Sequence, residues 1–277
     1  MVAISSIILS SLMAGIVAIL ATVFIERSGG AIGAIITLPT TIVPASIGIW
    51  IGVNGELVSF AAAMSMVPIG MLLNVLFLGS WRILPSYLEH LFSERNLVFA
   101  VGICSVLFWL FSAGVSTIIV EYISNFVGPI YVGICAVFIA FVLGYIAVSK
   151  GGDAPPGLNR VSFLSLLSRG IAAGLAIGLS VWIAGLGLPF ISGVISVFPA
   201  IFLTTMVSLW IAQGRAVPVG ATGPMMFGST SVSIYALICI IIFPSFGIWA
   251  GSIISWLLSV ILYSVPVGIM TWRTIDA

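Results

Sequence analysis

The sequence predicts an all-α polytopic membrane protein of about nine transmembrane helices, arranged as an inverted repeat around two broken central helices. Three observations predict it: the composition, the distribution of basic residues, and the likeness of two proline-containing stretches 160 residues apart. The chain has 277 residues, of which 61% are hydrophobic and only 5% are charged. A soluble domain carries about 25% charged residues because its surface faces water. Most of the surface of this protein must therefore face lipid.

The chain divides into nine apolar segments. A helix needs about 20 apolar residues to cross the hydrocarbon core of a bilayer. Continuous apolar runs argue against an outer-membrane barrel, whose strands alternate apolar and polar residues. The first segment begins near residue 1 without a basic leader, so we expect a membrane helix there rather than a cleaved signal. The predicted spans are 2–25, 30–53, 57–79, 96–119, 126–148, 164–186, 188–212, 217–243 and 246–270.

The basic residues give an independent test of this division. With nine crossings, the connections that carry or adjoin all eight basic residues fall on one face of the membrane, whereas Glu56 and Glu121 fall on the other. Loops rich in Lys and Arg stay in the cytoplasm. We therefore expect the N-terminus outside and the C-terminus in the cytoplasm, in a plasma membrane or a bacterial inner membrane. The eight residues are Arg27, Arg82, Arg95, Lys150, Arg160, Arg169, Arg215 and Arg273.

An internal repeat appears when the chain is aligned with itself at an offset of 160 residues. The aligned stretch 33–51 contains five identities, which pair Gly33 with Gly193, Ile35 with Ile195, Pro39 with Pro199, Trp50 with Trp210 and Ile51 with Ile211. The same offset superposes two stripes of small residues, Ser10, Ala14 and Ala18 on Gly170, Gly174 and Gly178. Such stripes let membrane helices approach closely.

The offset divides the chain into two four-helix units. We predict a first repeat at 1–119, a linking transmembrane helix at 120–148, a cytoplasmic linker at 149–163 and a second repeat at 164–277. A single intervening crossing places the second unit upside down relative to the first. Inverted repeats of this kind are common in secondary transporters. The plan is similar in architecture to that of drug/metabolite-type transporters, and the residues assign no family.

The two central stretches, Gly29–Val53 and Ile191–Gln213, provide the candidate site. Proline interrupts a helix, and the freed backbone groups must be satisfied by protein or by a water-filled cavity. We therefore predict a binding site near mid-membrane; the alternative is plain kinking, with each hydroxyl bonded to its own backbone. Glu26 is a candidate gating or coupling residue, or else an interfacial ion pair with Arg27. The candidate binding residues are Thr37, Pro39, Thr40, Thr41, Pro44, Ser46, Asn74, Ser196, Pro199, Thr204, Thr205 and Ser208.

These features predict a secondary transporter or facilitator that moves a small polar solute or an ion by alternating access. A channel and a non-transporting scaffold or assembly protein are the alternatives. We expect no enzymatic activity, metal or cofactor, because the single histidine, His90, lies in a charged connection. The expected partners are the lipid bilayer and the solute or ion, and a homodimer is left open. The net charge of +1 argues against a nucleic-acid partner.

Overall fold

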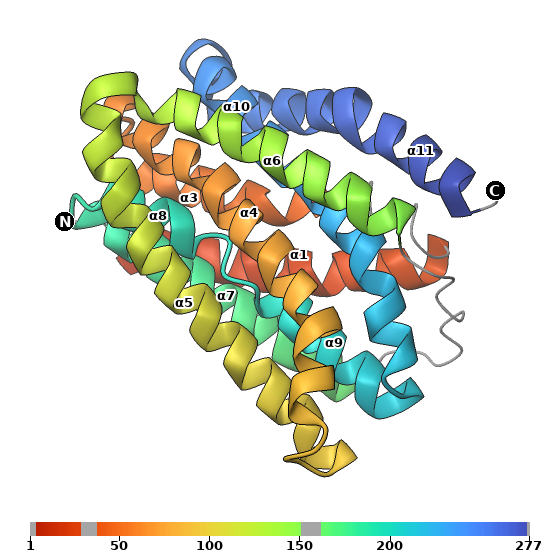
Figure 1. Cartoon of the computed structure of the whole chain (residues 1–277). Coiled ribbons are helices and arrows are strands. Elements are labelled where there is room, and N and C mark those ends of the chain that lie inside the picture. The colour runs from red at the N-terminus through yellow and green to blue at the C-terminus, as the bar shows by residue number, and fades with distance from the viewer. Residues whose placement is uncertain (1–3, 29–37, 151–161, 276–277) are drawn as a thin grey trace.

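The protein is a bundle of helices, described here from a computed structural model that covers residues 4–28, 38–150 and 162–275 (Figure 1). These residues form helices and the turns between them, without a strand. Within these described ranges, seven helices are long and apolar enough to cross a membrane. The predicted class, a helical multi-pass membrane protein, is therefore confirmed at this level.

The first half of the chain begins with α1 (Ile4–Ser28) and continues with a short 3-10 helix, η1 (Leu38–Ile42), that leads directly into α3 (Val43–Gly52). It ends with three long helices, α4 (Leu57–Leu88), α5 (Glu94–Val127) and α6 (Pro129–Ser149). The second half contains α7 (Phe163–Gly185), α8 (Pro189–Ile195), α9 (Ala200–Gln213), α10 (Ala216–Ser259), the π-helical η2 (Val260–Ser264) and α11 (Val265–Ile275).

Most of these boundaries lie within three residues of the predicted ones, but α4 and α5 continue well beyond their predicted ends at 79 and 119, to Leu88 and Val127. The predicted segment 188–212 corresponds to α8 and α9 together, and only residues 38–52 of the predicted segment 30–53 are described as helix. Residue Gly247 has φ 70° and ψ 177°, which breaks α10 into two helices. Glycine adopts this positive φ without the steric cost that a side chain brings. The predicted segments 217–243 and 246–270 thus meet at an observed break.

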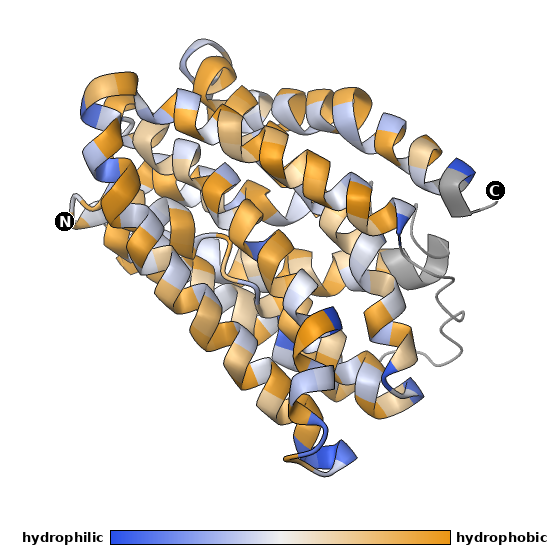
Figure 2. Cartoon of the chain, in the orientation of Figure 1, coloured by the Kyte–Doolittle hydropathy of each residue, from blue (hydrophilic) through white to orange (hydrophobic). Residues whose placement is uncertain are grey.

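Helix α4 is the most deeply buried of the long helices. It packs against α5, α6, α8 and α10, and α6 lies against both α4 and α10. Figure 2 shows hydrophobic residues along the lengths of the helices, with most of the strongly hydrophilic residues near their ends and turns. This pattern fits a bundle whose middle faces lipid and whose ends reach water.

Helices α1 and α7 pack antiparallel at very short range. A Cβ added to Gly170 would lie 3.1 Å from the carbonyl oxygen of Gly15, and one added to Gly174 would lie 2.8 Å from that of Ser11. The glycine stripe of α7 is therefore a contact surface, as predicted. On α1, however, Ser11 and Gly15 make this contact, one residue round the helix from the predicted stripe.

The predicted α1 stripe is buried on a neighbouring face. Ser10 lies where a Cβ on Gly48 of α3 would be, whereas Ala14 and Ala18 face a cavity. One face of α1 thus contacts α7 while the next faces α3 and the interior.

Candidate functional site

The second central stretch is broken at mid-length. Helix α8 ends at Ile195 and α9 begins at Ala200, with Pro199 at its N-cap position. Proline has no N–H to continue the helical ladder, and it disfavours helical dihedrals in the residue before it. Tight turns fill the gap: the N–H of Phe198 donates to the carbonyl of Ile195 at 3.0 Å, and that of Ala200 to Phe198 at 2.7 Å.

The first central stretch changes helix type at the matching place. Pro39 lies in η1, a 3-10 helix, and Pro44 lies in the first turn of α3, where a missing N–H costs nothing. Leu38, Pro39 and Ile42 are buried. Both stretches therefore present irregular backbone inside the bundle, as the proline positions predicted.

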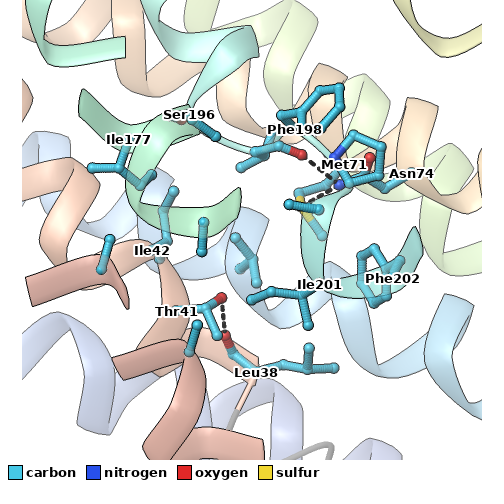
Figure 3. Close-up of a pocket in the computed structure, with 18 residues that line it drawn as sticks. Leu38, Thr41, Ile42, Met71, Asn74, Ile177, Ser196, Phe198, Ile201 and Phe202 are labelled. Carbon is cyan, nitrogen blue, oxygen red and sulfur yellow. Dashed lines mark hydrogen bonds between the residues drawn. The ribbon is translucent and has the colours of Figure 1, made fainter. Parts of the chain in front are cut away.

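A cavity of about 60 Å³ lies where the two interrupted stretches meet. That volume is enough for a few water molecules. Figure 3 shows its wall formed by Leu38, Thr41 and Ile42 of η1 together with Ser196 and Phe198 of the α8–α9 connection. Val197 and Pro199 of the same connection also line it. The other lining residues come from α1, α4, α7, α9 and α10: Ala14, Ala18, Met71, Asn74, Ala173, Ala176, Ile177, Ala200, Ile201, Phe202 and Val232.

Three polar side chains line the cavity. The amide nitrogen of Asn74 donates to the carbonyl of Val197 at 2.8 Å (Figure 3). The hydroxyl of Thr41 donates to the carbonyl of Leu38 at 2.8 Å, and that of Ser196 to the carbonyl of Gly193 at 2.7 Å. Asn74 thus connects α4 to the break between α8 and α9.

Of the twelve predicted binding residues, four line this cavity: Thr41, Asn74, Ser196 and Pro199. Pro39, Pro44 and Ser46 are buried beside it, and Thr40 accepts a hydrogen bond from the indole of Trp256. Thr37 lies outside the described residues. Glu26 lies in the last two turns of α1, and its side chain also lies outside the described part.

The other three predicted residues lie along α9, away from the cavity lining. Thr205 bonds its own backbone, through the carbonyl of Ile201 at 2.7 Å, as the kinking alternative expected. Ser208 donates to the hydroxyl of Ser165 of α7 at 3.1 Å. Thr204 accepts a hydrogen bond from a buried arginine, which the sequence placed among the basic residues in or beside the connections of the cytoplasmic face.

That arginine, Arg169, is only 4% exposed. Its Nη1 donates to the hydroxyl of Thr22 at 2.7 Å and its Nε to the hydroxyl of Thr204 at 3.2 Å. The guanidinium thereby joins α1, α7 and α9. Thr22 and Arg169 each lie four residues from the nearest lining residue of their own helix, and Thr204 lies two residues from Phe202, so this arginine cluster lies about 3 to 6 Å along the helices from the cavity.

A second polar contact lies on the other side of the cavity. The hydroxyls of Ser46 in α3 and Tyr235 in α10 are 2.9 Å apart, and both side chains are fully buried. Ser46 is four residues beyond Ile42, and Tyr235 is three residues beyond Val232, both of which line the cavity. Since α3 packs against Ser10 and Val181, this contact lies toward the N-terminal end of α1, opposite Thr22.

A pair of serines connects α7 and α8 on the same side of the cavity as the Ser46–Tyr235 contact. Each hydroxyl, of Ser180 and of Ser192, donates to the backbone carbonyl of the other residue at 2.9 Å. The cavity therefore lies between two layers of polar contacts, one at each end.

The sequence contained one signal for the arginine cluster that the prediction did not use. The stripe of α1 at positions 10, 14 and 18 continues at the same spacing to Thr22. The hydroxyl of Thr22 donates to the carbonyl of Ala18 at 2.8 Å and keeps its lone pairs for a donor from another helix. Arg169 lies one residue before Gly170 of the matching stripe, so it was the nearest candidate.

Comparison with the models of known protein families, with curated proteins and with solved structures finds no match to this chain. Among the described residues, no three side chains of His, Cys, Asp or Glu come together as metal ligands.

Proposed function

We propose that this protein is a secondary transporter, which binds a small polar solute between the two interrupted stretches. The observation that carries the proposal is the cavity at the meeting point of η1 and the α8–α9 break. Discontinuous helices at such a midplane site offer backbone groups and helix ends to a solute. None of the described residues that line the cavity is ionisable, which favours transport of a solute over catalysis.

The two polar layers support alternating access. The arginine cluster (Thr22, Arg169 and Thr204) lies on the side of the predicted cytoplasmic face, and the Ser46–Tyr235 contact lies toward the opposite face. Hydrogen bonds of this kind break and reform without loss of the apolar core. We propose that each layer opens in turn while the other stays closed.

The packing also supports the proposed nine-crossing inverted repeat. Under the offset of 160, α1 corresponds to α7 and α4 to the first part of α10, and both pairs are in direct contact. The linking helix α6 packs against both members of the second pair. A pseudo-two-fold axis in the membrane plane predicts such self-pairing of equivalent helices.

Uptake into proteoliposomes tests the proposal with a matched pair of variants. Ala173 lines the cavity, whereas its neighbour Ala172 lies on the same helix outside the lining. Ala173→Leu should reduce uptake at least about tenfold because the added carbons fill the cavity, and Ala172→Leu should leave it near wild type. The panel consists of labelled amino acids, sugars, amides, Na⁺, K⁺ and Cl⁻.

Three outcomes separate the alternatives. Uptake that is stimulated by unlabelled solute on the far side identifies a carrier, whereas uptake without such exchange identifies a channel. If no solute in the panel enters the proteoliposomes faster than it enters protein-free liposomes, the result supports the alternative of a non-transporting scaffold. If Ala173→Leu transports as well as wild type, the cavity is not on the pathway.

A further inference from the structure

The chemistry of the cavity wall restricts what can bind there. We infer that the site binds a small uncharged solute that donates a hydrogen bond to Oδ1 of Asn74. That the bound solute is also transported rests on the proposed function. The first step is the orientation of the Asn74 amide. Because the carbonyl of Val197 can only accept, the atom 2.8 Å from it must be the nitrogen, Nδ2. Oδ1 is therefore the free end.

Oδ1 is a buried acceptor that needs a donor. Asn74 is only 2% exposed, and its Oδ1 has no hydrogen-bond partner. Among the described lining residues, no other side chain has a buried polar atom in this condition. Buried polar atoms of native proteins nearly always have a partner, so an exception calls for a bound group.

The other two polar side chains also offer lone pairs rather than hydrogens. The hydroxyl hydrogens of Thr41 and Ser196 are engaged by the backbone carbonyls of Leu38 and Gly193. Nδ2 of Asn74 donates to the carbonyl of Val197 and to the sulfur of Met71, the latter at 3.4 Å. The three polar side chains of the described lining therefore contribute oxygen acceptors, and none of them keeps a free N–H or O–H donor. This arrangement favours a solute that donates hydrogen bonds over an anion, which only accepts them.

A cation fits the wall poorly for two reasons. Fifteen of the eighteen lining residues, all but Thr41, Asn74 and Ser196, are apolar, and none is acidic. A charge buried without a counter-charge is strongly disfavoured. In addition, the first residues of α9, Ala200 to Phe202, line the cavity, and the N-terminus of a helix carries positive partial charge. An uncharged donor with a small apolar body satisfies all these conditions.

Four probes of similar shape test the inference by binding alone. Acetamide is a neutral donor, acetamidinium its cationic counterpart, acetate its anionic counterpart, and N,N-dimethylacetamide a neutral amide without a donor. A ligand that binds the folded state raises its melting temperature with a saturating dependence on concentration. Purified full-length protein should show that dependence with acetamide and little or none with the other three.

Three variants make the result specific to the site. Asn74→Leu removes the acceptor and should weaken acetamide binding at least about tenfold. Any shift in melting temperature that acetamide still causes in this variant measures the general effect of amides on stability. Asn74→Asp keeps the shape and adds charge, so it should shift the preference to acetamidinium. Asn125→Leu, a matched change of an exposed amide at the end of α5, should bind acetamide like wild type.

Two results overturn the inference: a larger saturating shift with acetate or acetamidinium in the wild type, or an acetamide shift that survives Asn74→Leu. The failure of this inference can be told from the failure of the transport proposal. Uptake of a charged solute that Ala173→Leu blocks supports transport and refutes the neutral donor. Acetamide binding without uptake of any solute supports the site and refutes transport.

Discussion

At the scale of single residues, Arg169 is the clearest departure from an ordinary membrane helix. Ionisable residues inside membrane segments are costly and usually functional. This one lies in the second turn of α7, almost fully buried, with its guanidinium on two threonine hydroxyls from two other helices. Its position one helical turn from the cavity makes it the central residue of the proposed cytoplasmic gate.

The hydrogen bonds of Arg169 should contribute measurably to stability. Replacing Thr22 or Thr204 by Val keeps the side-chain shape and removes one hydrogen bond to a charged group, which is worth roughly 1.5–3 kcal/mol. Each variant should therefore lower the melting temperature of the purified protein. Arg273→Ala, at an exposed position near the end of α11, is the control and should change it little. Equal melting temperatures for wild type and both valine variants would contradict this account of the cluster.

Glu56 provides a pH-dependent contact at the start of α4. Its carboxylate accepts the backbone N–H of Val58 at 3.0 Å and that of Ser59 at 2.6 Å, as an N-cap residue does. Hydrogen bonds from the side chain and backbone of Ser59, and then from the backbone of Val58, lower the pKa of Glu56 below its ordinary value of 4.5. A lowered folded-state pKa means that the carboxylate stabilises the fold above about pH 4.5 and that this contribution disappears as the pH falls through the folded-state pKa.

The difference in melting temperature between wild type and Glu56→Gln should therefore be largest near neutral pH and shrink as the pH falls below 4.5. Thermal melts of both proteins from pH 3 to pH 7 measure it. A constant difference over that range would show that Glu56 does not titrate with folding.

At the scale of helices, close backbone approach decides how the elements pack. Gly193 of α8 faces α4 so closely that an added Cβ would overlap the carbonyl oxygen of Ala63. Backbone cannot move aside as a flexible side chain can. Glycine at position 193 therefore allows the short helix α8 to pack directly against α4. This packing also positions the cavity wall formed by Ser196 and Val197.

Gly193→Ala should separate α8 from α4 and destabilise the protein by about 1–3 kcal/mol. Gly114 of α5 is the matched control, because an added Cβ there meets nothing within 4 Å. Gly114→Ala should be neutral or stabilising by up to about 1 kcal/mol, through the better helix propensity of alanine. Comparing the melting temperatures of the two variants with wild type tests the argument, which fails if Gly193→Ala is as stable as Gly114→Ala.

At the scale of the whole molecule, the number of crossings is the feature most open to test. In the part of the chain that the structure describes, seven helices are long enough by themselves. The proposed nine-crossing plan instead counts residues 30–53 as one crossing and divides the chain at Gly247. The two counts place different connections on the same face of the membrane, so labelling of the connections distinguishes them.

Single cysteines introduced at Asn54, Asn125 and Gly247 should react with a membrane-impermeant thiol reagent from one side, and those at His90, Gly214 and Arg273 from the other. The experiment uses intact vesicles and a background in which Cys104, Cys135 and Cys239 are replaced by alanine. The native activity or melting temperature of that background serves as the control. Labelling of Asn125→Cys and Gly247→Cys from opposite sides is incompatible with nine crossings.

The sequence alone determined the class of the protein, most helix boundaries and the location of the break at Pro199. These properties are local: hydropathy follows from composition over a window of residues, and Pro199 interrupts a helix wherever that helix lies. Four of the candidate residues, Thr41, Asn74, Ser196 and Pro199, were found because their polarity or backbone effect stands out within an apolar run.

Only the tertiary structure decided which polar groups face each other. Thr204 and Thr205 are neighbours of the same type and both donate to a carbonyl of their own helix, yet only Thr204 also accepts a hydrogen bond from Arg169. The contacts of Arg169 with Thr204 and of Ser46 with Tyr235 join residues 35 or more positions apart in the sequence. The absence of a partner for Oδ1 of Asn74 likewise depends on which residues surround it in the fold. Contacts of that kind follow from how the helices are rotated about their axes, which a stripe of small residues predicts only to within one position.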